Sequence, residues 1–169
     1  GKVLTRPAWF LDVTQQGEGI VDVTTHLVDL VQWECFPEQL IDYAKDIRIH
    51  SARRWTTSLD REAFRTITKL DLFPDYLLPA VDKDSLLQVY CNGEINYTLK
   101  GVHAKVSVSW NYKAPEGTGD THYSLMRGSK ANLVIRQGAA EGYKPVLYIE
   151  PVSRDTAYEQ ALQQQVGLV

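Results

Sequence analysis

Residues 17–33, which read GEGIVDVTTHLVDLVQW, place four side chains capable of chemistry on one side of a predicted helix. Counting ~100° per residue, these four fall within a band of about 60°: Asp22, His26, Asp29 and Trp33. A carboxylate four residues before an imidazole lies within side-chain reach, where it favours the charged ring and fixes its tautomer. A histidine held in this way can take a proton from a substrate hydroxyl. The spacing therefore predicts an acid–base pair made of Asp22 and His26.

The same side chains also have purely structural interpretations. Asp22 stands where an N-cap would precede a helix that starts near residue 23, and aspartate is common at that position. A single helical histidine such as His26 is more often structural than catalytic, and Asp29 and Trp33 suit packing or loop anchoring. The pattern alone therefore marks a candidate site and leaves its reaction open.

The elements that must position these side chains follow from the hydrophobic pattern. The helix over about residues 23–33 has a separate apolar face for packing on a sheet, made of Val23, Leu27, Leu30 and Val31. Residues 102–110 alternate apolar side chains with polar ones, which is typical of a strand with one buried face. The pair Asn92-Gly93 lies between two β-prone runs and predicts a hairpin turn.

The rest of the pattern completes an α+β fold. Further strands are expected over 47–52 and 144–152, with a second hairpin turning at 128–130 and helices over 56–70 and 153–166. Helices early and late in the chain, with antiparallel hairpins between them, predict an open, mostly antiparallel β-sheet with helices packed on one face. The other face is more polar and is either wet or in contact with a polar partner.

Composition and motifs exclude several classes of function. The 169 residues suit one domain, and 18 basic against 21 acidic residues with no basic block give no support to nucleic-acid binding. No apolar run approaches the ~20 residues of a membrane span. Cys35 and Cys91 are far apart and the histidines are dispersed, so we expect no metal site. Without a GxGxxG or phosphate-binding loop, this chain should bind no dinucleotide of its own.

Three stretches resemble the glucose-fructose oxidoreductase / inositol dehydrogenase / rhizopine-catabolism (Gfo/Idh/MocA) family. The first matches its signature GGG…D-x-G-x-H-x-x-D…W through Gly17, Gly19, Asp22, His26, Asp29 and Trp33. The second matches a later hairpin motif through Asn92, Gly93 and Trp110, and the third is YSLMRGSKANLVI. Together they cover about residues 9–137. The closer match, which includes RPAWFLDV, is to the C-terminal domain of an oxidoreductase subgroup common in Bacteroidetes-type bacteria.

The resemblance implies that residues 1–169 are a single C-terminal substrate-binding and oligomerisation domain. The full-length protein would bind NAD(P) in an N-terminal Rossmann domain absent from this chain, act on a hydroxyl of a sugar, polyol or cyclitol, and form a homo-oligomer through the sheet face. Asp22 and His26 would be the catalytic pair. The residues expected to contact the substrate are Trp9, Glu18, Asp29, His103 and Trp110. A bacterial protein of this kind is either cytoplasmic or exported.

Departures from the family pattern keep other functions open. Glu18 and Thr24 replace glycines of the signature, and residues 37–81 follow the family only loosely, so a substrate cannot be transferred. The chain begins with Gly1 rather than Met, so we expect a piece of a longer protein that is inactive alone. The alternatives are a non-catalytic carbohydrate-binding or scaffold domain that retained the fold, and an unrelated carbohydrate-binding α+β domain. A GxGxxG motif and an EKP-type lysine upstream would favour the enzyme.

Overall fold

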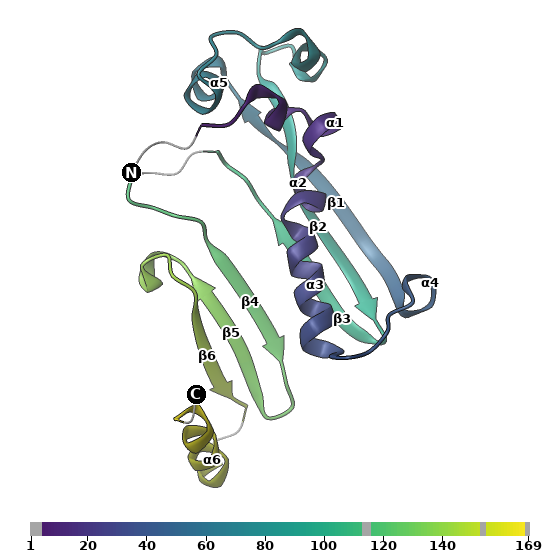
Figure 1. The fold of residues 1–169 in the computed structure, drawn as a ribbon, viewed down its shortest axis with the longest axis vertical. Helices are drawn as coiled ribbons and strands as arrows, with labels where there is room; N and C mark the ends of the chain where they lie inside the picture. Colours follow the sequence, from purple (N-terminus) through teal and green to yellow (C-terminus); the bar gives the residue numbers. More distant parts are fainter. Residues whose placement is uncertain (1–4, 113–115, 153–154, 168–169) are drawn as a thin grey trace. The chain divides into compact units, whose positions relative to one another are not determined.

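The computed structural model describes residues 5–112, 116–152 and 155–167 (Figure 1). The chain divides into two compact units, Gly1–Lys113 and Ala114–Val169.

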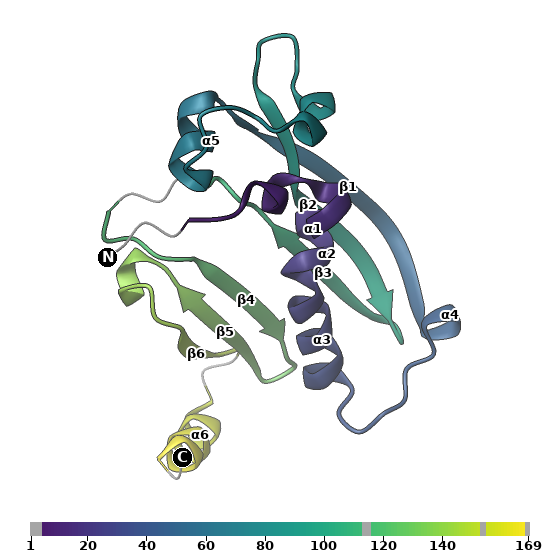
Figure 2. The ribbon, with the colours of Figure 1, turned by 45° about the horizontal axis from the view of Figure 1, so that its top comes forward.

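The first unit is built on a three-stranded antiparallel sheet in the order β1-β2-β3. Its strands are β1 (Ile47–Leu59), β2 (Leu87–Leu99) and β3 (Val102–Val108). Short helices precede the sheet: a 3-10 helix (Ala8–Leu11), α1 (Val13–Gln16), α2 (Gly19–Asp22), the longer α3 (Thr24–Cys35) and α4 (Tyr43–Asp46). Between β1 and β2 come α5 (Arg61–Thr68) and a 3-10 helix (Asp75–Ala80). Figures 1 and 2 show α2 and α3 running along one face of this sheet.

The second unit is a separate antiparallel sheet in the order β4-β5-β6. Its strands are β4 (His122–Arg127), β5 (Ala131–Gln137) and β6 (Val146–Pro151), with a 3-10 helix (Ala139–Glu141) before β6. The unit ends with α6 (Thr156–Val166), whose N-cap is Asp155. The predicted start of this helix at 153 lies outside the described residues. The α+β class with antiparallel strands is confirmed, and the strands form two small sheets.

The hairpin predicted at Asn92-Gly93 is wrong. Both residues lie inside β2, and the chain reverses instead at Lys100-Gly101, where both residues have positive φ. The turn signal fails because Asn92 and Gly93 are buried and used in packing: Asn92 forms internal hydrogen bonds, and Gly93 faces Ile20 of α2. The alternation predicted over 102–110 is confirmed in β3, where Ala104, Val106 and Val108 are buried and the residues between them are exposed.

The packing face of α3 differs from the predicted one. Leu27, Val28 and Val31 pack against a cluster formed by Tyr97, Leu99, Ala104 and Val106. Val23 and Leu30, which were expected to face the sheet, are 36% and 45% exposed. The reason is Thr24, which is buried and donates its hydroxyl to the Gly19 carbonyl oxygen at 3.2 Å. This contact sets the phase of the helix, so the positions three, four and seven residues later face inward.

The Tyr97 hydroxyl gives a stability prediction. Its side chain is buried under α3, and within the described residues this hydroxyl has no hydrogen-bond partner. A buried polar group without a partner costs free energy. We expect Tyr97→Phe to raise the free energy of unfolding by about 1 kcal/mol, measured by urea unfolding. Tyr90→Phe, at an exposed position, is the control. A less stable Tyr97→Phe protein would contradict the prediction.

Candidate functional site

Helix α2 lies directly on strand β2 because two glycines remove the side chains that would separate them. A Cβ atom at Gly19 would lie 1.9 Å from the Cys91 carbonyl oxygen. A Cβ atom at Gly93 would lie 2.7 Å from Cβ of Ile20. Neither glycine has a positive φ, so space is what demands glycine at both positions. This close approach brings Asp22, the last residue of α2, beside β2.

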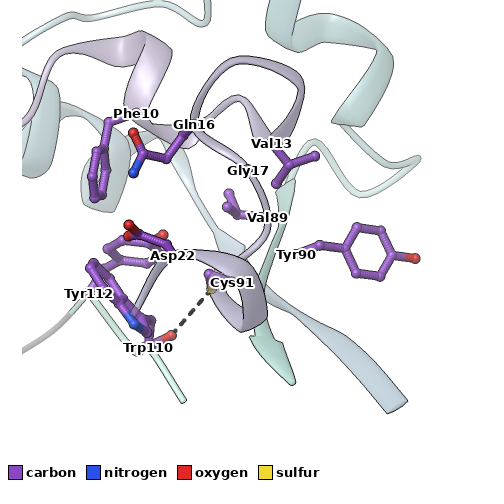
Figure 3. A pocket seen from close by; sticks show the side chains of 11 residues that line it. Phe10, Val13, Gln16, Gly17, Asp22, Val89, Tyr90, Cys91, Trp110 and Tyr112 are labelled. Atoms are coloured by element: carbon purple, nitrogen blue, oxygen red, sulfur yellow. Dashed lines mark hydrogen bonds between the residues drawn. The ribbon is translucent and has the colours of Figure 1, made fainter. Parts of the chain in front are cut away.

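Asp22 lines a small niche with an aromatic wall (Figure 3). The niche volume is about 10 Å³, room for about one water molecule. The residues most relevant to its chemistry are Phe10, Gln16, Asp22, Cys91, Trp110 and Tyr112. The Trp110 ring centroid lies 5.8 Å from that of Phe10 and 5.6 Å from that of Tyr112. A whole sugar ring cannot enter this niche, so a substrate of that size could place only one group there.

The Asp22 carboxylate is available to a ligand. Within the described part of the chain it has no hydrogen bond or ion pair. The N-cap interpretation is wrong, because Asp22 ends α2 and α3 follows Val23 with no side-chain cap. Burial, followed by the nearby Cys91 and Asp22, raises the pKa of Tyr112. Tyr112 is therefore a neutral phenol near physiological pH, able to donate a hydrogen bond.

His26 lies in the next helix and is exposed. Across the described ranges no hydrogen bond or ion pair joins it to Asp22. Asp29 and Trp33, on the same predicted stripe, are exposed as well, Trp33 to 75%. The structure thus places Asp22 in the niche and leaves His26 and Asp29 open on the surface of α3.

Glu18 fixes the loop before α2. Its carboxylate forms an ion pair with Arg54 of β1, whose guanidinium lies 4.4 Å from the centroid of the Tyr90 ring. Gly17 precedes it with φ of 90°, a conformation that glycine adopts readily. Glu18 therefore has a protein partner at the position where the sequence predicts a substrate contact.

Of the other residues predicted to contact the substrate, one lines the niche and two do not. Trp110 lines the niche. Trp9 is 46% exposed and touches Phe10 edge-on, with 6.4 Å between ring centroids, but does not line the niche. His103 lies on the opposite face of the sheet, because it alternates with the buried Ala104, and its ring stacks on His50 at 5.8 Å.

Four of the niche residues most relevant to its chemistry were not predicted from the sequence: Phe10, Gln16, Cys91 and Tyr112. One signal was present, since Trp110 and Tyr112 are two positions apart and share a side of extended chain. Nothing in the sequence joins that pair to Phe10, a hundred positions earlier. Across the described ranges, no group of three or more histidine, cysteine or acidic side chains could hold a metal ion, and no helix there is long and apolar enough to cross a membrane.

Comparison with known proteins identifies the type of domain. A family model described as "Putative oxidoreductase C terminal domain" matches residues 1–169. The chain belongs to this family. The crystal structure of a "putative oxidoreductase" from Parabacteroides merdae matches 97% of this oxidoreductase C-terminal domain, with 59% sequence identity and a TM-score of 0.92. The domain covers 38% of that chain. No curated protein matches it.

On the outer face of the first sheet, the face turned away from α2 and α3, this oxidoreductase C-terminal domain has an ion-pair cluster whose contribution to stability should depend on pH. The Glu94 carboxylate lies 2.8 Å from Lys105 Nζ and 3.4 Å from an Arg53 nitrogen. Lys105 first, and then Arg53, hold the pKa of Glu94 below its usual value. Because folding lowers this pKa, the carboxylate stabilises the fold above the unfolded-state pKa, and this contribution is lost as the pH falls through the folded-state pKa.

We therefore expect Glu94→Gln to be less stable than the parent near pH 7, and the difference to shrink toward pH ~3. Urea unfolding over a pH series measures both proteins. A difference that stays constant over the whole series would contradict the prediction.

Proposed function

We propose that this chain is the substrate-side domain of an NAD(P)-dependent oxidoreductase of the Gfo/Idh/MocA type. It would act on a hydroxyl group of a sugar, polyol or cyclitol. The observation that carries the proposal is the Asp22 carboxylate, which lines an aromatic niche without a side-chain partner in the described part of the chain, close in sequence to the exposed His26. Membership of an oxidoreductase C-terminal family supplies the reaction class.

The residues divide the chemistry as follows. His26, exposed on α3, accepts the proton of the substrate hydroxyl. Asp22 accepts a hydrogen bond from a substrate group at the mouth of the niche, beside the Trp110 and Tyr112 rings. A nicotinamide cofactor, held by a domain outside this chain, would supply the acceptor for the hydride of the carbon that bears this hydroxyl. Removal of both the proton and the hydride converts the substrate alcohol into a carbonyl product.

The size of the niche shapes this arrangement. With about 10 Å³ available, it admits one small group, while the rest of the substrate lies over α2 and α3. Those helices would form one wall of the site, and the remaining part of the protein the other. The same proposal includes a homo-oligomer formed through the outer face of the first sheet, which carries Arg53, Lys105 and the His50–His103 pair. Light scattering on the full-length protein measures this assembly.

The test uses the full-length protein with NAD⁺ or NADP⁺ and a panel of sugars, polyols and cyclitols. Formation of reduced nicotinamide with at least one of them is expected, and residues 1–169 alone are expected to show none. If the full-length protein reduces neither cofactor while the isolated chain binds a sugar in calorimetry, the carbohydrate-binding alternative replaces the proposal.

A further inference from the structure

We infer that Asn92 is a positioning residue of the candidate site: its buried carboxamide holds Trp110, and through it the aromatic wall of the niche. Asn92 is 2% exposed, in the middle strand of the first sheet. Its effect on turnover rests on the proposed function, whereas its effect on Trp110 does not.

The hydrogen bonds of Asn92 begin where strand pairing ends. The ladder between β2 and β3 stops at Gly93 and Val108, so Trp110 lies beyond it. There the Trp110 backbone N–H donates to Asn92 Oδ1 at 2.6 Å. Asn92 Nδ2 in turn donates to Thr57 Oγ1 at 2.9 Å and to the Trp55 carbonyl oxygen at 3.2 Å. One side chain thus ties the segment after β3 to β1.

The carbonyl group of Trp110 is fixed by the same network. Thr57 Oγ1 donates to this oxygen at 2.5 Å, and Cys91 Sγ donates to it at 3.6 Å. Asn92, Thr57 and Trp110 therefore form a closed ring of hydrogen bonds, and both backbone polar groups of Trp110 are bound by side chains. A residue held in this way has little freedom to shift relative to the sheet.

The chemistry of the network requires an amide at position 92. The side chain must accept from one neighbour and donate to two others within a buried space. An ionised aspartate could accept but not donate, and it would lie against the Trp55 carbonyl oxygen. Leucine has the same branched shape but is larger and offers neither function.

The network acts on the site through the Trp110 ring. In the niche wall this ring contacts Phe10 and Tyr112, and the Asp22 side chain lies beside the same aromatic group (Figure 3). Because the niche has a volume of only about 10 Å³, moving the indole by about 1 Å would open or close it. Displacements of that size cost about 10²-fold in turnover when they misplace a substrate. Asn92 thereby sets the shape of a site that it does not line.

The experiment uses the full-length protein labelled with 5-fluorotryptophan. The Trp110 signal is assigned by its loss in Trp110→Phe and followed by fluorine NMR, with kcat/KM per folded enzyme measured beside it. We expect Asn92→Leu to shift or broaden the Trp110 signal at temperatures well below the melting temperature of the variant. We also expect it to lower kcat/KM by about 10–100-fold. Asn96→Leu is the matched control, since this half-buried amide of the same strand donates, within the described residues, only to Ser51. It should leave the Trp110 signal and turnover unchanged.

Thr57→Val keeps Asn92 but removes the Thr57 bonds to Asn92 and Trp110, so it should move the Trp110 signal in the same direction. This variant decides the question if Asn92→Leu does not fold. If stability falls while the Trp110 signal and kcat/KM stay at the parent values, Asn92 is purely structural and the inference is overturned. If the parent protein turns over no substrate, the proposed function fails, and the Trp110 signal alone decides whether Asn92 positions the ring.

Discussion

Replacing His26 with alanine in the full-length protein is expected to lower kcat by about 10²–10⁴-fold, the usual contribution of a general base. The side chain is exposed on α3, so its removal leaves no cavity and breaks no hydrogen bond in the described structure. The folded state should therefore keep its stability and its circular dichroism spectrum. Steady-state kinetics and thermal unfolding of the same preparation measure both effects.

Glu34→Ala is the matched control for His26→Ala. Glu34 is another exposed residue of α3, near its C-terminal end, and it has no assigned role in the site. Its replacement also removes a polar side chain from the exposed surface of the same helix, so turnover should stay at the parent value. Unchanged turnover in His26→Ala would remove His26 from the mechanism and would favour the non-catalytic alternative.

Gly19→Ala should produce the largest loss of stability. The added methyl would lie 1.9 Å from the Cys91 carbonyl oxygen, a backbone atom of the central strand that cannot move without disturbing its pairing. Overpacking of this kind costs about 3 kcal/mol. Helix α2 must lift away from β2, and Asp22 must leave the niche with it. Urea unfolding gives the loss of stability, and the Trp110 fluorine signal reports the opening of the niche.

Gly101→Ala separates steric from conformational effects. Gly101 has φ of 84° in the turn between β2 and β3, and a Cβ atom there would meet nothing within 4 Å. Its substitution should cost only the strain of the left-handed conformation, about 1 kcal/mol, and should leave the Trp110 signal alone. Equal losses in the two variants would show that close packing of α2 on β2 is not what Gly19 provides.

The parts of the fold that sequence predicted well are those where one local rule decides. Strand β3 alternates buried and exposed residues as predicted, because its period of two coincides with one packed face. The helix expected over 23–33 is present as α3, but its inward face is rotated. No local rule reveals this, since the buried Thr24 hydroxyl sets the phase through a contact with Gly19. The turn signal of Asn92-Gly93 was overridden in the same way by tertiary contacts.

The candidate site could be predicted only in part for a related reason. Asp22 and Trp110 stood out through residue type and family pattern, and both line the niche. Phe10 and Tyr112 are ordinary aromatic residues in sequence, and their meaning comes from segments a hundred positions apart. His26 shows the opposite error: helical spacing predicted a contact with Asp22, but in the described structure His26 is exposed and forms no hydrogen bond or ion pair with Asp22.

The ion pair between Glu18 and Arg54 ties the loop before α2 to strand β1 by charge. Glycine at position 18 would leave Arg54, among the described residues, with the Tyr90 ring as its partner and would increase the conformational freedom of the loop. The two charges therefore act as a pair, and replacing either one removes the contact that holds this loop to the strand.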